Sequence, residues 1–202
     1  MVATAEKTRL YTHEEYLKME ERASEKHQFF NGKIIPLAGG TVNHNEFSAI
    51  TITALTNIAR AIRNPKFRVY TSDMKIRIPR RNTVVYPDAL AIAEKPEFFE
   101  DRRDIITNPL LIVEVVSPSS EVVDRGAKFY DYRTLPSFRE YLLVYQDEPL
   151  VAHAVRQGDD LWKMTDVRGL EAVLELATLG CSLRLSDIYY DIEFEAPQYE
   201  IN

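Results

Sequence analysis

An apolar segment interrupted by one carboxylate constrains the fold of this chain more than any other sequence feature. Residues 110–116 read LLIVEVV, so Glu114 lies in a segment that is otherwise apolar on both faces of a strand. Residues 84–93, VVYPDALAIA, repeat this pattern with Asp88. Strands that are apolar on both faces belong to the centre of a sheet that is covered on both sides. The two segments therefore predict an α/β domain with a central sheet flanked by helices.

The two carboxylates need partners if their strands are buried. A charged carboxylate without a partner is costly in an apolar interior, or it takes up a proton instead. One interpretation is that Asp88 and Glu114 each form an ion pair or lie at a solvent-exposed strand end. The other interpretation is that they share a cation, because their strands are expected to be neighbours. Hard cations such as Mg²⁺ prefer oxygen ligands, and the carbonyl group of Val115 offers a further one.

A polar helix face follows the segment 110–116. The pattern of residues 121–135 predicts a helix, and Asp124, Lys128 and Tyr132 are spaced by four residues, which places them on one of its faces. If this helix packs over the end of the preceding strand, Lys128 reaches the carboxylates. The alternative is an ordinary solvent-exposed pair between Asp124 and Lys128.

The rest of the chain alternates between helical and extended segments. Thr12 begins a capping-box pattern, and Asn31-Gly32 predicts the turn of a hairpin. The expected elements are helices over 13–22, 43–62 and part of 185–192, and strands over 26–30, 33–37, 73–81, 140–146, 150–155 and 161–165. This order is typical of a mixed α/β domain.

Length, charge and cysteine content limit the class of protein. The 202 residues suit one domain, expected over 11–192, with an N-terminal extension over 1–10 and a C-terminal tail over 193–202. The formal net charge of −6 disfavours a nucleic-acid coat protein but leaves room for a local basic patch. The single cysteine, Cys181, excludes an internal disulfide and a cysteine-based zinc cluster. With no apolar signal segment and no run near the roughly 20 residues of a membrane span, we expect a cytoplasmic protein.

Basic residues gather in the segment 73–81. Lys75 and Arg77 alternate there with apolar residues, and Arg80 and Arg81 follow Pro79. This alternation predicts a half-buried strand with a basic outer face. On an acidic protein such a face is a candidate DNA-binding rim, because the attraction to phosphate is local. The alternative is an ordinary solvent-exposed strand face.

A series of short motifs resembles one known family. In chain order these motifs are Tyr86-Pro87-Asp88, then Glu114-Val115-Val116-Ser117-Pro118-Ser119, then Asp124, Lys128 and Tyr132. Their order and spacing resemble the Uma-type restriction endonuclease family of the PD-(D/E)XK nuclease superfamily, over most of residues 11–192. The resemblance implies a restriction-endonuclease-like fold, which is a mixed central sheet flanked by helices.

The resemblance also implies roles for individual residues. Asp88 and Glu114 would bind Mg²⁺ or Mn²⁺. Lys128 would replace the lysine that the superfamily pattern places at the position of Val116. Tyr132 would support the site. The implied reaction is hydrolysis of phosphodiester bonds, expected in DNA, by water that the metal activates. Because two strands need two active sites, a homodimer is expected.

One position departs from the family pattern. Relatives usually read Lys-His-Glu-Tyr where residues 26–29 of this chain read KHQF, so Gln28 replaces a carboxylate. An amide oxygen can bind a metal or a water molecule, but it cannot serve as a general base. Gln28 is therefore either a supporting group of the site or a polar residue at a strand edge. The alternative function is a catalytically degenerate nuclease-fold module that binds nucleic acid or a protein partner.

His44 stands near the start of the helix expected over 43–62. Its ring either faces the candidate site or forms hydrogen bonds at the helix end, and a lone histidine favours the second interpretation.

Overall fold

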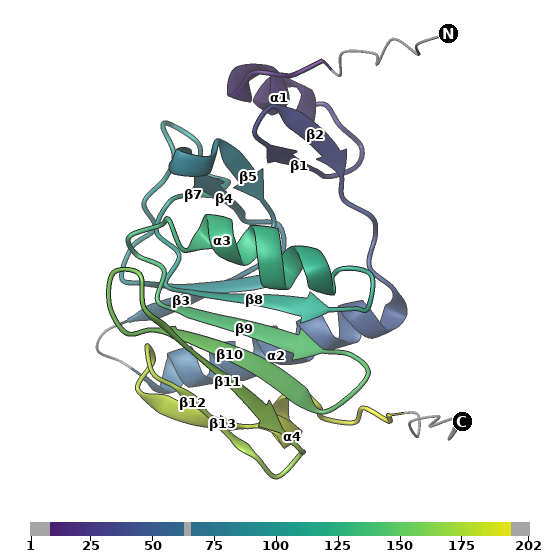
Figure 1. Cartoon of the computed structure of the whole chain (residues 1–202), viewed down its shortest axis with the longest axis vertical. Coiled ribbons are helices and arrows are strands. Elements are labelled where there is room, and N and C mark those ends of the chain that lie inside the picture. Colours follow the sequence, from purple (N-terminus) through teal and green to yellow (C-terminus); the bar gives the residue numbers. More distant parts are fainter. Residues whose placement is uncertain (1–8, 63–65, 195–202) are drawn as a thin grey trace, which may run out of the picture.

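A mixed six-stranded sheet forms the centre of the protein (Figure 1), whose computed structural model describes residues 9–62 and 66–194. The strand order is β11-β10-β9-β8-β6-β3, and only β8 and β9 run parallel. The bounds are β3 (Phe67–Thr71), β6 (Ala89–Ala93), β8 (Leu111–Val116), β9 (Glu140–Tyr145), β10 (Leu150–Arg156) and β11 (Trp162–Arg168). The predicted mixed sheet is confirmed.

Helices cover both faces of this sheet, as the apolar strands predict. On one face, α2 (Val42–Ala61) packs against the side of β8 that carries Val113 and Val115. On the other face, a π-helical turn, η2 (Val123–Lys128), continues into α3 (Phe129–Tyr132). Figure 1 shows α3 in front of the sheet and α2 behind it. Since side chains alternate along a strand, Glu114 points to the face that α3 covers.

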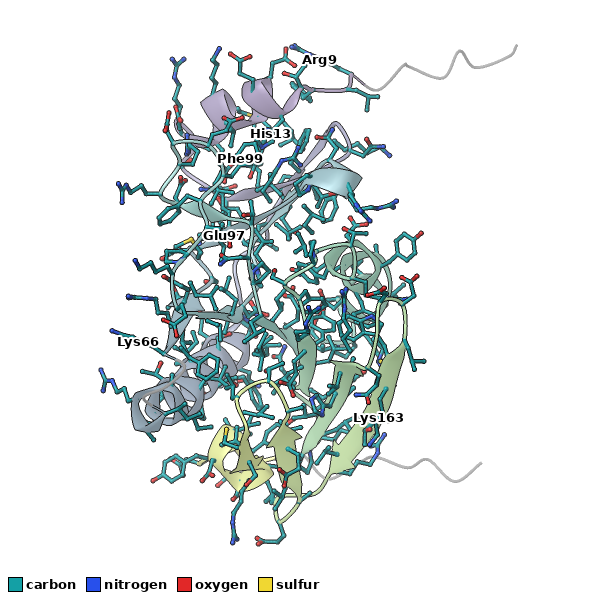
Figure 2. The ribbon with its side chains drawn as sticks, turned by 90° about the vertical axis from the view of Figure 1, so that its left-hand side faces the viewer. Arg9, His13, Lys66, Glu97, Phe99 and Lys163 are labelled. Atoms are coloured by element: carbon teal, nitrogen blue, oxygen red, sulfur yellow. The ribbon has the colours of Figure 1, made fainter. Side chains whose placement is uncertain are left out.

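A second sheet, which the sequence did not predict as a separate unit, lies beside the first. Its strand order is β2-β1-β5-β4-β7. The bounds are β1 (His27–Phe30), β2 (Lys33–Pro36), β4 (Lys75–Ile78), β5 (Thr83–Val85) and β7 (Ile105–Ile106). One face packs against α1 (His13–Glu20). Figure 2 shows His13 of α1 next to Phe99, and their ring centroids are 5.0 Å apart.

The chain crosses from the second sheet to the first at Tyr86-Pro87-Asp88. The prediction of one strand over 84–93 is therefore wrong, because β5 and β6 belong to different sheets. Pro87 has no N–H group and cannot donate a ladder hydrogen bond, so an interior strand is interrupted there. The interruption places Asp88 immediately before β6.

Most of the other predicted elements are confirmed within a few residues. Asn31 and Gly32 have φ angles of 44° and 91°, as the tight turn between β1 and β2 requires. The last predicted helix is a single turn, α4 (Leu185–Ile188). The sequence missed β3, β7 and the hairpin of β12 (Val173–Leu176) and β13 (Cys181–Arg184).

Two further predictions concern the ends of the chain and the membrane. The extension over 1–10 and the tail over 193–202 fall largely outside the described residues. Among the helices that the structure describes, none combines the length and apolar character that crossing a bilayer requires.

Glu140, at the start of β9, fixes the turn between β12 and β13 to the central sheet. Its fully buried carboxylate accepts hydrogen bonds from Nε2 of His153 at 2.6 Å, from the N–H groups of Ala177 and Thr178 at 3.0 Å, and from the Thr178 hydroxyl group. Burial alone would raise the pKa of Glu140, but the bonds from His153 and Thr178 hold it below its ordinary value.

We predict that Glu140→Ala lowers the free energy of unfolding by about 3 kcal/mol, because it leaves buried donors unpaired. Urea denaturation measures this change. The control is Glu175→Ala on the exposed side of β12, for which we expect a change within about 0.5 kcal/mol. If Glu140→Ala and Glu175→Ala unfolded at the same urea concentration, the role of Glu140 in fixing the β12–β13 turn would be contradicted.

Candidate metal-binding and active site

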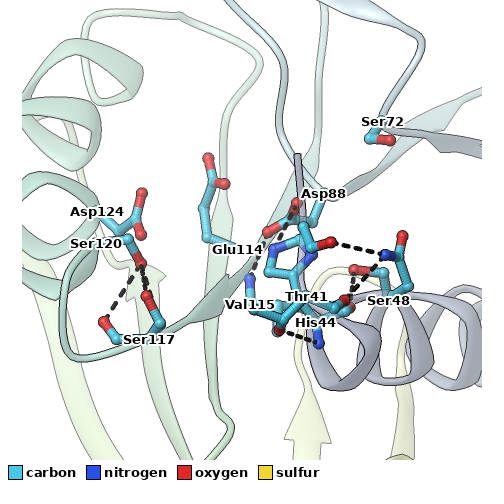
Figure 3. A network of polar contacts seen from close by, with 12 residues as sticks. Thr41, His44, Ser48, Ser72, Asp88, Glu114, Val115, Ser117, Ser120 and Asp124 are labelled. Atoms are coloured by element: carbon cyan, nitrogen blue, oxygen red, sulfur yellow. Dashed lines mark hydrogen bonds and ion pairs between the residues drawn. The ribbon is translucent and has the colours of Figure 1, made fainter. Parts of the chain in front are cut away.

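Asp88, immediately before β6, lies opposite Glu114 on the neighbouring strand β8. The strands β6 and β8 pair antiparallel with Ala89 facing Val113, so the register places Asp88 across from Glu114. Oδ2 of Asp88 accepts a hydrogen bond from the N–H group of Val115 at 2.7 Å. Figure 3 shows Glu114 between Asp88 on one side and Asp124 on the other. The two carboxylates predicted from the apolar strands therefore converge at one place.

The helical segment after β8 brings the expected partners to Glu114. Oε1 of Glu114 accepts a hydrogen bond from the Tyr132 hydroxyl group at 2.8 Å, and Oε2 accepts one from Nζ of Lys128 at 2.9 Å. Nζ of Lys128 also lies 2.9 Å from Oδ1 of Asp124. The shared helix face of Asp124, Lys128 and Tyr132 is confirmed, and the exposed-pair alternative is wrong because all three residues are buried.

The local helix geometry at this point is unusual. Asp124 and Lys128 both belong to the π-helical turn η2, whereas Tyr132 ends the short helix α3. Single π-helical turns are rare in proteins as a whole, and those that occur are often found at functional sites. This turn places Asp124 and Lys128 in the protein interior, next to Glu114, which is the charged residue of β8.

The site holds more negative than positive charge. Glu114 and Asp124 pair with the ammonium group of Lys128, and Asp88 adds a third carboxylate whose charge acts on Glu114. Burial raises the pKa of Glu114 to about 8, and Asp124 and Asp88 add to this shift although Lys128 opposes it. Burial lowers the pKa of Lys128, but Glu114 and Asp124 outweigh it and hold this pKa above its ordinary value. A divalent cation bound beside Glu114 would oppose this shift and favour the charged carboxylate.

The donor chemistry fits a hard divalent cation that keeps several waters. Within the described ranges, no three His, Cys, Asp or Glu side chains lie close enough together to hold a metal ion by themselves. Mg²⁺ is usually bound by only one or two carboxylates together with water. Asp88 and Glu114 provide two such carboxylates, so the residues present fit Mg²⁺ or Mn²⁺.

The structure also places His44 at this site. Nε2 of His44, in the first turn of α2, lies 3.2 Å from Oδ1 of Asp88. The hydrogen bond with Asp88 raises the pKa of His44. The sequence favoured a His44 ring that forms hydrogen bonds at the helix end. That interpretation is wrong, because the ring contacts Asp88 instead. The sequence could not reveal that α2 begins beside Asp88.

Gln28 lies on β1 of the second sheet and is 8% exposed. It shares a strand face with Phe30, which packs into the apolar cluster that contains Tyr132. Its side-chain oxygen, Oε1, is buried and has no hydrogen-bond partner among the described residues. Gln28 thus faces the same interior as Tyr132, but it does not join the hydrogen bonds of Asp88, Glu114 and Lys128.

The basic outer face predicted for the segment 73–81 is wrong for two of its residues. The strand β4 lies between β5 and β7, and Lys75 and Arg77 are each only 8% exposed. Nζ of Lys75 pairs with Asp104 at 2.7 Å. Arg77 donates to the carbonyl group of Thr83 and to the Asn82 side chain. The two remaining basic residues of the predicted rim are exposed, in the turn η1 (Pro79–Arg81).

Comparison with known families gives a match over most of the chain. The family model Uma2, described as "Putative restriction endonuclease", matches residues 13–186.

Two similar proteins come from Synechocystis sp., and both bear the name of uncharacterized proteins. The first, sll1609, is 38% identical over 170 residues, which are 84% of this chain and 94% of that protein. The second, slr1290, is 33% identical over 183 residues, which are 90% of this chain and 92% of that protein.

A similar solved structure is that of a protein from Anabaena variabilis, described as a putative nuclease belonging to DUF820. The TM-score is 0.71 at 14% identity, and the match covers 88% of this chain and 97% of the other. This likeness supports the restriction-endonuclease-like fold.

We predict that Glu114→Gln changes the pH dependence of stability without metal. Between pH 4.5 and about 8 the unfolded chain has lost the Glu114 proton while the folded chain keeps it, so raising the pH favours unfolding. Over this interval the variant should gain stability relative to the wild type, by up to about 1.4 kcal/mol per pH unit.

Urea denaturation in a metal chelator at several pH values measures this difference. Glu171→Gln, at an exposed position, serves as the control and should run parallel to the wild type. If the free energies of unfolding of Glu114→Gln and the wild type differed by the same amount at every pH, the raised pKa of Glu114 would be contradicted.

Proposed function

The chain belongs to the Uma2 family, and on that premise we propose that it is a metal-dependent nuclease that hydrolyses phosphodiester bonds in DNA. Family membership gives it a nuclease-like character, while the metal and the DNA substrate are our proposal. The observation that carries the proposal is the convergence of Asp88, Glu114 and Lys128 at one place, near the point where the chain crosses from the sheet that contains β5 to the central sheet.

Asp88 and Glu114 would hold Mg²⁺ or Mn²⁺. When bound, such an ion lowers the pKa of a water molecule and neutralises charge on the phosphate. The Val115 N–H group and the Tyr132 hydroxyl group each fix one carboxylate, so the two ligands are oriented before substrate arrives.

Lys128 has a different role in this proposal. Its ammonium group lies between Glu114 and Asp124 and keeps its charge at neutral pH. It can therefore hold the attacking water or stabilise the negative charge that develops on a phosphate oxygen. Hydrolysis adds water to phosphorus, and the ester oxygen leaves with a proton.

The partners follow from this chemistry. Exposed Arg80 and Arg81 are candidates for phosphate contacts, although Arg81 already pairs with Asp131. Cleavage of both DNA strands needs two copies of the site, so we expect a homodimer acting in the cytoplasm.

Cleavage of plasmid and short single-stranded DNA, with Mg²⁺ or Mn²⁺ and with a chelator, tests the proposal. We predict metal-dependent cleavage that falls at least about 100-fold in Asp88→Ala and Glu114→Ala, and about 100-fold in Lys128→Gln. Glu171→Ala, at an exposed position, should retain the rate. Cleavage that survives in Asp88→Ala and Glu114→Ala would place the activity elsewhere.

The second candidate function is a nuclease-fold module that binds nucleic acid or a protein partner without turnover. The observation that favours it is Gln28, a neutral amide at a position where the family pattern that the sequence resembles has a carboxylate; its side-chain oxygen has no partner among the described residues. If the wild type binds DNA without cleaving it, we predict that Gln28→Glu gains metal-dependent cleavage. Gln157→Glu, in an exposed turn, adds the same charge and should gain none. Equal cleavage by the two Gln→Glu variants would contradict this role of Gln28.

A further inference from the structure

The two oxygens of the Asp88 carboxylate are held in different ways. Oδ2 accepts from the backbone N–H group of Val115 at 2.7 Å, and β8 fixes the position of this donor. Oδ1 lies 3.2 Å from Nε2 of His44, and that donor belongs to a side chain on another element. The orientation of Asp88 therefore depends on where the His44 ring lies.

The start of α2 fixes the backbone of His44. The Thr41 hydroxyl group accepts a hydrogen bond from the His44 N–H group at 3.2 Å and caps the helix. The Asn45 side chain donates to the carbonyl groups of Gly40 and Thr41, at 3.2 and 2.9 Å. Ser48 donates to the carbonyl group of His44 at 2.8 Å. These bonds, several of them drawn in Figure 3, tie the preceding loop to the first helical turn.

The loop before α2 leaves space for the His44 ring. A Cβ atom on Gly40 would lie 2.8 Å from Nδ1 of His44, which is too close for a non-bonded contact. A Cβ atom on neighbouring Gly39 would meet no atom within 4 Å. Both glycines are exposed, and neither has a positive φ. Alanine at Gly40 would therefore displace the ring, whereas alanine at Gly39 would change nothing near it.

We infer that His44 is a positioning residue that holds the Asp88 carboxylate in the orientation in which it binds the divalent cation, and that Gly40 provides the space for its ring. The inference rests on the proposed function, because it assigns His44 to the same site. Hydrogen bonds to a ligating carboxylate fix its orientation and contribute to metal affinity. Lys128 of η2 and Tyr132 of α3 hold the Glu114 carboxylate in the same manner, from the other face of the central sheet.

The test is the affinity of the full chain for Mn²⁺, measured by calorimetry for the wild type, for Asp88→Ala and for four further variants. His44→Ala and Gly40→Ala should weaken binding by about 10- to 100-fold. His44→Gln should restore most of the affinity, because its Nε2 can donate to the same oxygen. Gly39→Ala is the matched control and should bind Mn²⁺ like the wild type. Thermal unfolding without metal should remain a cooperative transition for all four variants, so that the loss of Mn²⁺ affinity and its rescue by His44→Gln are measured on folded chains.

Three outcomes would overturn the inference. One is wild-type affinity in His44→Ala. Another is equal affinity in Gly40→Ala and Gly39→Ala. The third is a wild-type chain that binds no Mn²⁺, or binds it equally well with Asp88→Ala, which overturns the proposed function as well. The first two leave the proposed function intact, so the two failures are distinguishable.

Discussion

A carboxylate in the interior of a central strand is the constraint from which the site follows. Glu114 is 2% exposed and has two further carboxylates near it, so it is tolerable only with donors at both of its oxygens. The segment after β8 provides them, because a π-helical turn and α3 place Lys128 and Tyr132 over the end of the strand. In the proposed function, this negative charge, which one ammonium group does not fully neutralise, is what would attract a divalent cation.

Sequence patterns predicted the parts of this arrangement that depend on local periodicity. The apolar faces of β8 indicated a covered central strand, and the spacing of Asp124, Lys128 and Tyr132 indicated one helix face. The convergence of Asp88 and Glu114 was also expected, because a shared cation was one of the two interpretations of carboxylates in neighbouring core strands, beside separate ion pairs. These features follow from side-chain alternation and helical repeat, which a sequence records directly.

The remaining features depend on how distant elements meet. The pattern of 84–93 reads as one strand, yet Pro87 divides it between two sheets. The alternation of Lys75 and Arg77 predicts an exposed face, but strands on both sides of β4 bury them against acidic and carbonyl partners. His44 was underestimated because nothing near it in the sequence indicates Asp88. Pairing partners and sheet membership are tertiary properties, and hydrophobic periodicity alone does not encode them.

We propose that Asp88 and Glu114 together bind one divalent cation. Anomalous diffraction from a crystal soaked in Mn²⁺ tests this claim most directly, because it locates the ion without relying on activity. We expect a single strong peak within coordination distance of both carboxylates, about 2 Å from their oxygens, with water completing the shell. A map with no peak there, or with a peak bound to only one of the two residues, would contradict it.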